Sequence, residues 1–474
     1  MLDGAIYLGD SRIADSVVRV VRAPWSGETV GEVHLASRAI ADRAAALAVD
    51  ATRALTAMPS HARRDALLQI SQSLGARREP LARILALEAG KPIAFARAEV
   101  VRAESTFRLA SEEATRLGGE ALTLDVTPAG EGMRGVVWRV PSGPVLGIAP
   151  FNFPLNLVAH KVAPALACGC AIVLKPAPQA PLSALFLAEI VRDAFGGFGA
   201  LTVLPCDVDV AESLVRDERF ATLSFTGSAK VGWHLKSVAG NKRVLLELGG
   251  NAAAIVHEDA DLDFAISRVV SGAFGYAGQV CIKVQRLYVH DALYEAARDR
   301  LVALTRELAP VDPLDEKGVL SAMVDESNAK RVDDWVGEGA GRLLLRGARD
   351  RNRLAPSVVE FDGDGVGSKV VDEEVFGPVL TLHRYRDWDD ALTMADATRY
   401  GLQAGIFTDS RERVARAFER LHVGGLIVGD VPTFRVDNMP YGGMRDSGLG
   451  REGVRYAIEE MTERKLLVER VNRY

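Results

Sequence analysis

Two residues with the chemistry of covalent catalysis lie on separate segments near the middle of the sequence: Glu247 in the run Leu-Glu-Leu-Gly-Gly and Cys281 in the run Gly-Gln-Val-Cys. A thiolate can attack a carbonyl carbon, and a carboxylate can later activate the water that releases a thioester. An arbitrary cysteine is most often a small buried apolar side chain. Here Gly275 and Gly278 precede Cys281 and permit a sharp turn and the close approach of a reactant. The pair therefore predicts an enzyme that uses thioester chemistry.

Glu247 follows the apolar run 244–246, which is predicted to be a strand. A carboxylate in this place is costly to bury unless it lines a cleft, and parallel sheets bind ligands beyond the carboxyl ends of their strands. Burial there raises the pKa of a carboxyl group and suits it to general-base work near neutral pH. The alternative is an ordinary exposed acid at the end of a strand.

The run 225–228, Phe-Thr-Gly-Ser, follows a predicted strand and opens a predicted helix over 229–237. Amide groups at a helix start, with Gly227 allowing close approach, can hold a phosphate oxygen. Ser228 is equally an ordinary helix cap, and the Gly-x-Gly-x-x-Gly fingerprint of dinucleotide sites is missing at this place in the sequence. The run alone is a weak indication of phosphate binding.

The composition is that of a globular protein, with 474 residues, enough for two or three domains, and 48% hydrophobic residues. The net charge is −6 and both signs are spread along the chain, which argues against a nucleic-acid partner or an anionic membrane surface. Polar residues and a proline interrupt the most apolar stretch, 155–174, so we expect no membrane span.

The four cysteines are too few and too scattered for a disulfide framework, and the first residues lack the profile of a signal peptide, so we expect a cytoplasmic protein. Cys168 and Cys170 end a predicted helix before a strand and are expected to pack in the core. The eight histidines form no cluster with the spacing of metal ligands, and we expect no metal site.

Short β-branched runs alternate with helical patterns from about residue 140 onward, which predicts an α/β protein with two doubly wound parallel-sheet domains. The predicted strands are 171–174, 201–204, 221–225, 252–256 and 286–289, and the predicted helices are 182–195, 229–237, 262–276 and 293–307. Residues 122–145 are typical of a long β-hairpin, and 465–471 of a further strand. Such exposed strand edges are suited to pairing with another subunit.

Seven motifs, taken in order, resemble those of the aldehyde dehydrogenase superfamily: Pro-Phe-Asn-Phe-Pro at 150–154, Lys-Pro-Ala at 175–177, Phe-Thr-Gly-Ser at 225–228, Leu-Glu-Leu-Gly-Gly at 246–250, Gly-Gln-Val-Cys at 278–281, Glu-Val-Phe-Gly-Pro at 374–378 and Pro-Tyr-Gly-Gly at 440–443. The resemblance implies a variant Rossmann cofactor-binding domain (1–121 and 143–248), a catalytic domain (249–430), and bridging and oligomerisation segments (122–142, a β-hairpin arm, and 431–474). It also implies a homodimer or homotetramer.

The resemblance assigns a role to each catalytic residue. Cys281 attacks the aldehyde, the side-chain amide of Asn152 and the backbone N–H of Cys281 bind the oxyanion, and Glu247 activates the water that releases a carboxylic acid. A CoA-acylating semialdehyde dehydrogenase is the alternative enzyme, but its members typically lack the general base, and Glu247 is present. A catalytically silent binding or structural member would lack one of the three residues.

The resemblance also implies NAD or NADP as the cofactor. The residues carried over by position are Phe151, Lys175, Pro178, Gly227, Ser228, Glu374 and Phe376. Lys175 is implied to contact the adenosine ribose, Glu374 the nicotinamide ribose, and Phe376 the nicotinamide. Pro178 stands where NAD-preferring members often carry a glutamate that repels a 2′-phosphate, so NADP stays open although we favour NAD.

A short polar or anionic aldehyde is the expected substrate, with His160, Arg435 and Tyr441 as candidate contacts. His160 can share a helix face with Asn152, and its alternative is a packed helix histidine. Arg435 can clamp a carboxylate or phosphate, or can pair with Asp437. Val280 lacks the arginine expected of non-phosphorylating glyceraldehyde-phosphate enzymes.

Lys283 follows Cys281 closely and can lower the pKa of the thiol, but we favour a lysine that faces solvent.

Overall fold

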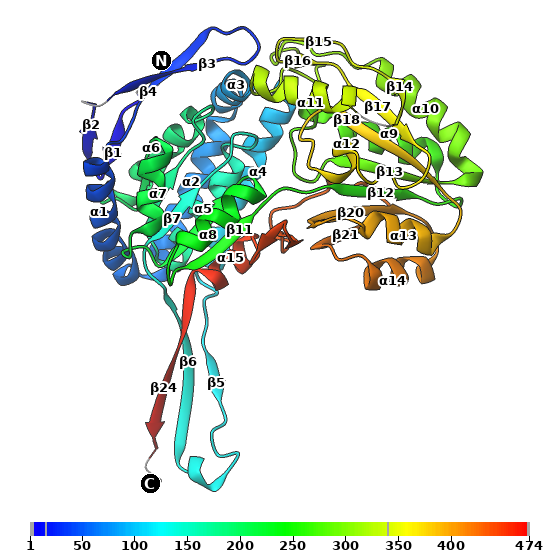
Figure 1. Cartoon of the computed structure of the whole chain (residues 1–474). Helices are drawn as coiled ribbons and strands as arrows, with labels where there is room; N and C mark the ends of the chain where they lie inside the picture. Colours follow the sequence, from blue (N-terminus) through cyan, green and yellow to red (C-terminus); the bar gives the residue numbers. More distant parts are fainter. Residues whose placement is uncertain (1–3, 15–16, 339–340, 472–474) are drawn as a thin grey trace.

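The chain forms two sheet-based halves and an arm that protrudes from the first half, with the C-terminus near the far end of the arm (Figure 1). The computed structural model describes residues 4–14, 17–338 and 341–471. The N-terminal strands β1 (Ile6–Leu8), β2 (Ser11–Ile13), β3 (Val18–Arg22) and β4 (Thr29–His34) form two antiparallel pairs at the outside of the first half.

The first large sheet has six strands in the order β23-β11-β10-β7-β8-β9. They are β7 (Val145–Ile148), β8 (Ile172–Lys175), β9 (Leu201–Val203), β10 (Thr222–Thr226), β11 (Arg243–Glu247) and β23 (Gly448–Leu449). The strands β7 to β11 run parallel to one another, and β23 is antiparallel to β11. Thr226 pairs with Glu247 where β10 and β11 end, so the predicted general base lies at the ligand-binding edge of the sheet.

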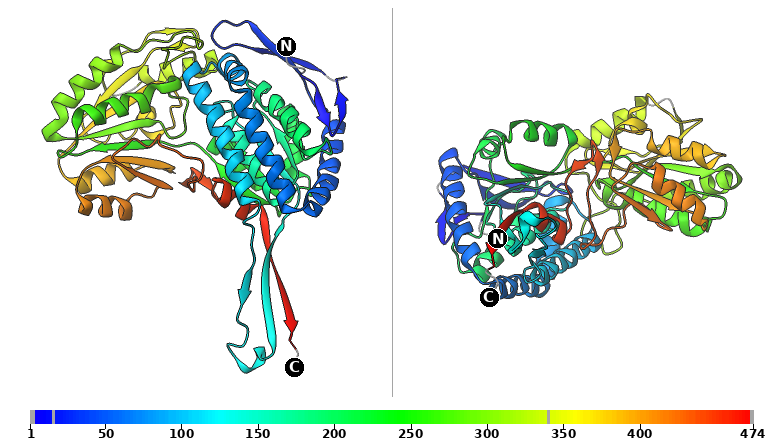
Figure 2. Two further views of the ribbon diagram at one scale, coloured as in Figure 1. Left: turned by 180° about the vertical axis from the view of Figure 1, so that it is seen from behind. Right: turned by 90° about the horizontal axis from the view of Figure 1, so that it is seen from below.

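Helices cover both faces of this sheet. They are α1 (Arg38–Ala57), α2 (Ser60–Ala76), α3 (Arg78–Ala89), α4 (Ile93–Glu113), α5 (Asn156–Cys168), α6 (Leu182–Phe195), α7 (Val208–Arg216), α8 (Ala229–Val238) and α15 (Val454–Glu460). α2 packs against α4 and α6, and α4 also packs against α5, which places the N-terminal helices behind the sheet (Figure 2). Ser37 caps α1 by accepting the amide of Ile40, and buried alanines such as Ala44 and Ala48 let α1 pack closely.

The second large sheet has seven strands in the order β14-β17-β18-β13-β12-β20-β21. They are β12 (Ala252–Val256), β13 (Val284–His290), β14 (Arg342–Leu345), β17 (Ser357–Phe361), β18 (Val379–Tyr385), β20 (Gln403–Phe407) and β21 (Gly425–Val428). All of the pairings are parallel except that of β14 with β17. Its helices are α9 (Leu262–Phe274), α10 (Tyr294–Arg306), α11 (Glu326–Glu338), α12 (Lys369–Asp372), α13 (Trp388–Asp396) and α14 (Arg411–Arg420).

Minor elements complete the described part of the chain. They are the short strands β15 (Arg349–Asp350), β16 (Arg353–Leu354), β19 (Tyr400–Gly401) and β22 (Met444–Arg445), and the 3₁₀ turns Pro128–Gly130, Gly275–Gly278 and Asp291–Leu293.

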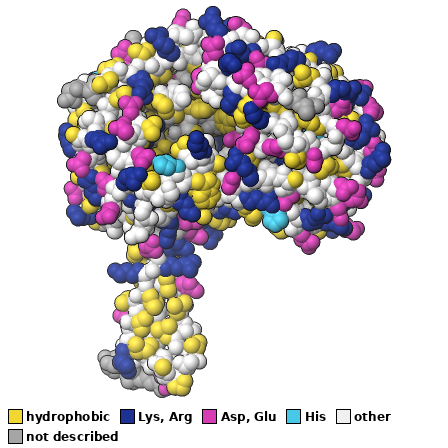
Figure 3. Space-filling view, in the orientation of Figure 1, with side chains coloured by type: hydrophobic (Ala, Val, Ile, Leu, Met, Phe, Trp, Pro, Cys, Tyr) yellow, Lys and Arg dark blue, Asp and Glu magenta, His cyan; other side chains and the backbone are white. Residues whose placement is uncertain are grey.

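The arm is a three-stranded antiparallel sheet of β5 (Glu120–Leu122), β6 (Met133–Pro141) and β24 (Thr462–Arg470). β24 pairs along the whole of β6, from Thr462 opposite Pro141 to Arg470 opposite Met133. Apolar side chains stay on its surface, among them Trp138, which is 54% exposed, and Leu466, which is 52% exposed. Figure 3 shows the hydrophobic side chains gathered on the arm.

The α/β class with two parallel sheets is confirmed, and so are the hairpin and the terminal strand. The helix predicted over 182–195 is α6, and the strand predicted over 252–256 is β12. The helix predicted over 262–276 ends at Phe274 instead, because the backbone turns into the left-handed region at Tyr276. The helices α1 to α4 were not predicted.

Candidate active site

A cleft of about 750 Å³ lies between the two halves, and the predicted catalytic residues Cys281, Glu247 and Asn152 all line it. Figure 3 looks onto the hollow between the halves. The same cleft is lined by all seven residues predicted to hold the cofactor, namely Phe151, Lys175, Pro178, Gly227, Ser228, Glu374 and Phe376. Residues from motifs far apart in the sequence therefore share one cavity.

Cys281 is presented to this cleft by a left-handed turn. After α9 ends, Tyr276, Ala277 and Gly278 have φ angles of 54°, 54° and 64°. A tyrosine and an alanine in this region are strained, which is typical of functional sites whose surroundings hold them in place. A Cβ at Gly278 would lie 2.4 Å from the carbonyl oxygen of Gly377, so the close approach at this position needs glycine.

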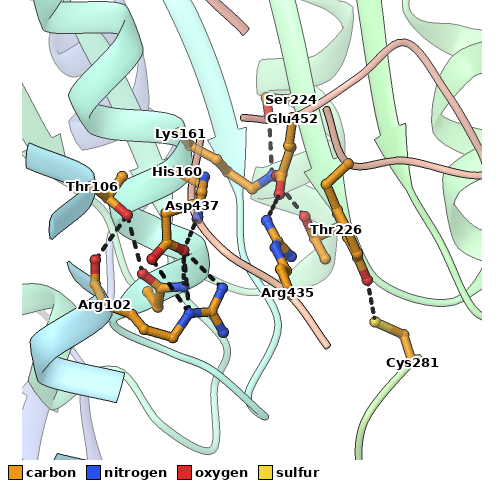
Figure 4. Close-up of polar contacts among 12 residues, drawn as sticks. Arg102, Thr106, His160, Lys161, Ser224, Thr226, Cys281, Arg435, Asp437 and Glu452 are labelled. Atoms are coloured by element: carbon orange, nitrogen blue, oxygen red, sulfur yellow. Dashed lines mark hydrogen bonds and ion pairs between the residues drawn. The ribbon is translucent and has the colours of Figure 1, made fainter. Parts of the chain in front are cut away.

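The sulfur of Cys281, labelled in Figure 4, lies 3.1 Å from the hydroxyl oxygen of Tyr441. The guanidinium of Arg435 stacks on the ring of Tyr441, 3.6 Å from its centroid. Burial raises the pKa of the Cys281 thiol to about 11, while the Tyr441 hydrogen bond and the charge of Arg435 oppose that rise. Cys281 is therefore a thiol at rest, with two neighbours that favour its thiolate.

Asn152 lies in the turn between β7 and α5 and is 4% exposed. Its Nδ2 donates to the carbonyl oxygen of Gln279 at 3.0 Å. The preceding ring of Phe151 meets Phe376 edge-on, with centroids 5.9 Å apart. A side-chain amide donor is thus fixed beside the backbone that leads to Cys281, where it can serve an oxyanion.

Glu247 ends β11, is 4% exposed, and has one carboxylate oxygen with no hydrogen-bond partner among the described residues. Burial raises its pKa well above the usual range, and the negative charge of Glu452 adds to the rise. Residue 442 must be small for this carboxylate to fit, because a Cβ at Gly442 would lie 2.7 Å from Oε1 of Glu247. A carboxyl group with a raised pKa is suited to accept a proton from water.

Two buried cations share one carboxylate behind the cleft. Glu452 accepts a hydrogen bond from Lys161 at 3.1 Å and another from Arg435 at 3.2 Å (Figure 4). Lys161 also donates to the hydroxyl groups of Ser224 at 3.0 Å and Thr226 at 2.7 Å. Although burial opposes it, the charges of Lys161 and Arg435 lower the pKa of Glu452 to about 2. Glu452 thus stays ionised close to Glu247, with its charge balanced by the two cations.

His160 is not among the residues that line the cleft. It is 1% exposed, and its Nε2 lies 2.8 Å from Asp437, which also accepts from Arg102 at 2.8 Å. The structure supports the alternative interpretation of a packed helix histidine. The alternative in which Arg435 pairs with Asp437 is not what the structure has: Arg435 pairs with Glu452, and Asp437 contacts His160 and Arg102 (Figure 4).

Lys283 does not face solvent, so that expectation is also wrong. The residue is 3% exposed and donates to the carbonyl oxygen of Val379 at 2.7 Å, and burial lowers its pKa to about 7. Cys168 and Cys170 are buried, as expected, and all four cysteines are free.

The cofactor side of the cleft fits a dinucleotide. The N-terminus of α8 opens at Ser228, whose side chain makes no capping hydrogen bond, so amide groups there are available to a phosphate. Glu374 accepts the amide of Gly250 at 3.1 Å, and a Cβ at Gly249 would lie 2.1 Å from its other oxygen. The two glycines thus make room for a carboxylate that can accept hydrogen bonds from ribose hydroxyls. Burial raises the pKa of Glu374 to about 7.

The sequence did not identify several residues that line the cleft, and Asn328 and Arg331 are two of them. Asn328 and Arg331 reach the cleft from α11, and Arg331 also donates to the carbonyl oxygen of Val375 at 3.0 Å. No motif surrounds them, and nothing in a single sequence indicates that α11 lies beside the predicted cofactor residues.

The described part of the chain contains no helix with the length and apolar composition of a membrane span. Within the same ranges, no group of three or more His, Cys, Asp or Glu side chains is arranged to hold a metal ion.

Comparisons with known proteins agree with this geometry. The sequence pattern of the aldehyde dehydrogenase family matches residues 14–467. A 3-sulfolactaldehyde dehydrogenase of Priestia aryabhattai is 40% identical over 448 residues, which cover 94% of this chain and 93% of the relative. A lactaldehyde dehydrogenase of Methanocaldococcus jannaschii is 37% identical over 94% of this chain and 96% of its own.

Among solved structures, aldehyde dehydrogenase 21 of Physcomitrella patens, in complex with its reaction product succinate, superposes with a TM-score of 0.96 at 42% identity, covering 98% of each chain. A glyceraldehyde-3-phosphate dehydrogenase of Methanocaldococcus jannaschii, complexed with NADP, has a TM-score of 0.91 at 36% identity, covering 95% of this chain and 98% of the other. The chain therefore belongs to the aldehyde dehydrogenase family and is an NAD(P)-dependent enzyme that oxidises an aldehyde to a carboxylic acid.

Proposed function

We propose that Cys281 is the nucleophile, Asn152 the oxyanion donor and Glu247 the general base of this reaction. The observation that carries the proposal is their placement on one cleft with the residues that fit a dinucleotide. The thiol of Cys281 first loses its proton to water. The thiolate sulfur then bonds to the aldehyde carbon, and the carbonyl oxygen becomes an oxyanion that accepts hydrogen bonds from Asn152 Nδ2 and the backbone N–H of Cys281. NAD(P)⁺, when bound, supplies the acceptor for the hydride that leaves this carbon.

The thioester that remains on Cys281 is released by water. Glu247 takes a proton from the water as its oxygen attacks the thioester carbon, and the bond to sulfur then breaks to give the acid. The high pKa of Glu247 makes it a competent proton acceptor. Tyr441 completes the site from the sulfur side, because its hydroxyl can donate to a thiolate as it forms and as it leaves.

The cofactor is proposed to lie along the first half of the cleft, which makes 1–121 with 143–248 the cofactor-binding domain and 249–430 the catalytic domain. Ser228 and Gly227 are placed for the pyrophosphate, Lys175 for the adenosine ribose, and Glu374 for the nicotinamide ribose. We keep NAD as the favoured cofactor.

The proposed substrate is a short anionic aldehyde, with its anionic group directed at Arg435. The side chain of this arginine is 6% exposed, and its Nε has no hydrogen-bond partner among the described residues. Arg435 stacks on the ring of Tyr441, and the hydroxyl of Tyr441 contacts the sulfur of Cys281. Only the Tyr441 side chain therefore separates an anion bound at Arg435 from the proposed nucleophile. His160 is proposed to act indirectly, by holding Asp437 in the segment that carries Arg435.

Similar proteins support a short polar or anionic aldehyde: sulfolactaldehyde, named for one relative, carries a sulfonate, and one solved structure holds the dianion succinate, whereas lactaldehyde, named for another relative, is short and polar but uncharged.

The arm is proposed to join subunits into a homodimer or homotetramer. β24 is an edge strand of the arm, and Leu466, Leu467 and Val468 on it are each at least 43% exposed. Covering such an apolar edge is a common use of strand pairing between subunits. A cytoplasmic location is likewise our proposal, and the four free thiols support it.

Activity measurements test the proposal. NAD(P)H formation at 340 nm with succinic semialdehyde should exceed that with a neutral aldehyde of equal length, and Arg435→Ala should remove most of the difference. Acid should form without CoA.

Cys281→Ser should abolish turnover, and Glu247→Gln should keep a single-turnover burst of NAD(P)H while the steady state slows. Normal turnover by Cys281→Ser, or loss of the burst in Glu247→Gln, would contradict the assigned roles.

A further inference from the structure

A lysine outside the cleft is fully buried beneath the two segments that carry Asn152 and Cys281. Lys91 lies in the short connection between α3 and α4, is 0% exposed, and pairs with Glu99 of α4, which is also buried. Burial lowers the pKa of Lys91, while the neighbouring carboxylate favours its charged form. Neither residue belongs to a motif that the reaction uses.

The ammonium of Lys91 is enclosed by two aromatic rings. It lies 3.7 Å from the ring centroid of Phe153 and 4.6 Å from that of Tyr276. The rings themselves meet edge-on, with centroids 6.2 Å apart. Such cation–π contacts are strongest where water is excluded, as it is at this fully buried ammonium.

One of the two rings lies on the segment that carries Asn152, and the other lies on the segment that carries Cys281. Phe153 directly follows Asn152, the proposed oxyanion donor. Tyr276 is the first left-handed residue of the turn that presents Cys281, and its hydroxyl donates to the carbonyl oxygen of Ala89 at 3.1 Å. One cation therefore contacts the donor segment and the nucleophile segment at once.

Glu99 ties the same pair to the start of α5. Its Oε1 accepts the backbone amides of Leu155 at 2.9 Å and Asn156 at 3.0 Å, at a helix start that has no side-chain cap of its own. The remaining oxygen holds Lys91. The segment between Asn152 and α5 is thus held from one side by the ring contact and from the other by the carboxylate.

A buried ion pair is a costly way to gain stability, because well-packed apolar side chains of similar volume stabilise a core equally well or better. A fixed charge between two rings does, however, define their separation and orientation. We propose that Lys91 is a positioning residue that holds Asn152 and Cys281 at the spacing the oxyanion requires, acting through Phe153 and Tyr276. The inference rests on the oxyanion role proposed for Asn152.

A double-mutant cycle tests the inference. Lys91→Met combined with Glu99→Gln removes both buried charges together, and Phe153→Leu removes one ring while leaving the ion pair intact. Each is measured alone and with Asn152→Ala, by steady-state kcat and KM and by thermal unfolding. Arg353→Met is the matched control, since it removes a cation from the ring of Trp25, 4.0 Å away and outside the cleft.

Loss of one oxyanion donor costs on the order of 100-fold in kcat, and a misplacement of about 1 Å can cost nearly as much. We expect Lys91→Met/Glu99→Gln and Phe153→Leu each to lower kcat by about tenfold or more with KM changed less than about threefold. With Asn152→Ala present, the further loss should be below about twofold, because the side-chain donor whose distance from Cys281 Lys91 sets has already been removed. Arg353→Met should match the wild type.

Two results overturn the inference on its own: an equal loss of kcat with and without Asn152, which shows that Lys91 acts independently of the oxyanion, or folded variants with wild-type kcat. An Asn152→Ala enzyme with normal turnover instead overturns the proposed oxyanion role, and the positioning role with it. If the Lys91→Met/Glu99→Gln protein does not fold, the Phe153→Leu cycle decides by the same criteria.

Discussion

Replacing Tyr441 by phenylalanine should make the Cys281 thiol less reactive. The phenylalanine keeps the ring on which Arg435 stacks and removes the hydroxyl that lies 3.1 Å from the sulfur. With its pKa raised to about 11, the thiol is ionised in roughly one molecule in 10⁴ at pH 7. The Tyr441 hydrogen bond lowers this pKa, because the hydroxyl can donate to a thiolate, and its loss should raise the pKa further.

A hydrogen bond to a charged group contributes about 1.5 kcal/mol, which corresponds to about one pKa unit. Alkylation of Cys281 by iodoacetamide between pH 7 and 9 should therefore be about tenfold slower in Tyr441→Phe, with the whole pH–rate curve displaced to higher pH. Mass spectrometry of the Cys281 peptide gives the rate, and Cys281→Ser gives the background from the three buried thiols. Tyr456→Phe on α15 is the matched control. Equal or faster alkylation of Tyr441→Phe across this range would refute the reasoning.

Three further predictions follow from the charges around the cleft. Glu452→Gln removes the carboxylate that raises the pKa of Glu247, so the rising limb of steady-state turnover against pH should move to lower pH by about one unit; a shift to higher pH would contradict the electrostatic assignment. Glu374, with a pKa of about 7, is mostly neutral at pH 6 and mostly charged at pH 8, so NAD(P)⁺ should bind up to about tenfold more tightly at pH 8, by calorimetry, and Glu374→Gln should show a flat profile; a pH-dependent Kd in that variant would point to another group. Pro178→Glu should lower kcat/KM for NADP⁺ by at least about tenfold while changing that for NAD⁺ by less than about threefold, and equal effects on both would place residue 178 away from the 2′ position.

The fold could be predicted from the sequence wherever a strand was a continuous apolar run between helical patterns. β12 is one such run of alanine, isoleucine and valine, and α6 has apolar residues at the helical period with Gly196 at its end. The N-terminal helices could not be predicted in the same way. In α1 the buried face consists mainly of alanines such as Ala44, Ala45 and Ala48, and alanine does not distinguish a buried face from an exposed one.

The residues proposed for catalysis and cofactor binding could be selected because all of them except Pro178 lie in short motifs, and all of them line one cleft. The charged residues that shift the pKa values of these side chains could not be predicted from the sequence. Lys161 and Glu452 are separated by 291 positions, and Arg102 and Asp437 by 335. Such pairs depend on how α4, α5 and the C-terminal segment pack, which a single sequence does not reveal. This is also why His160 was expected to face the substrate and instead bonds to Asp437.

The same packing couples the ionisation of Cys281 and Glu247, which line the cleft, to the charge of Glu452 behind it. Glu374 and Glu247 both raise the pKa of Cys281, and Glu452 raises that of Glu247, so each ionisation makes the next one harder. Arg435 opposes this at both Cys281 and Glu247, yet one of its hydrogen bonds is given to Glu452. At rest the site therefore has a protonated thiol and a Glu247 carboxyl with a raised pKa, beside the charged Arg435–Glu452–Lys161 cluster. Because the ionised form of each group is the reactive one, and because ionisation of one opposes ionisation of the other, nucleophilic attack and water activation are electrostatically favoured as successive events and disfavoured as simultaneous ones.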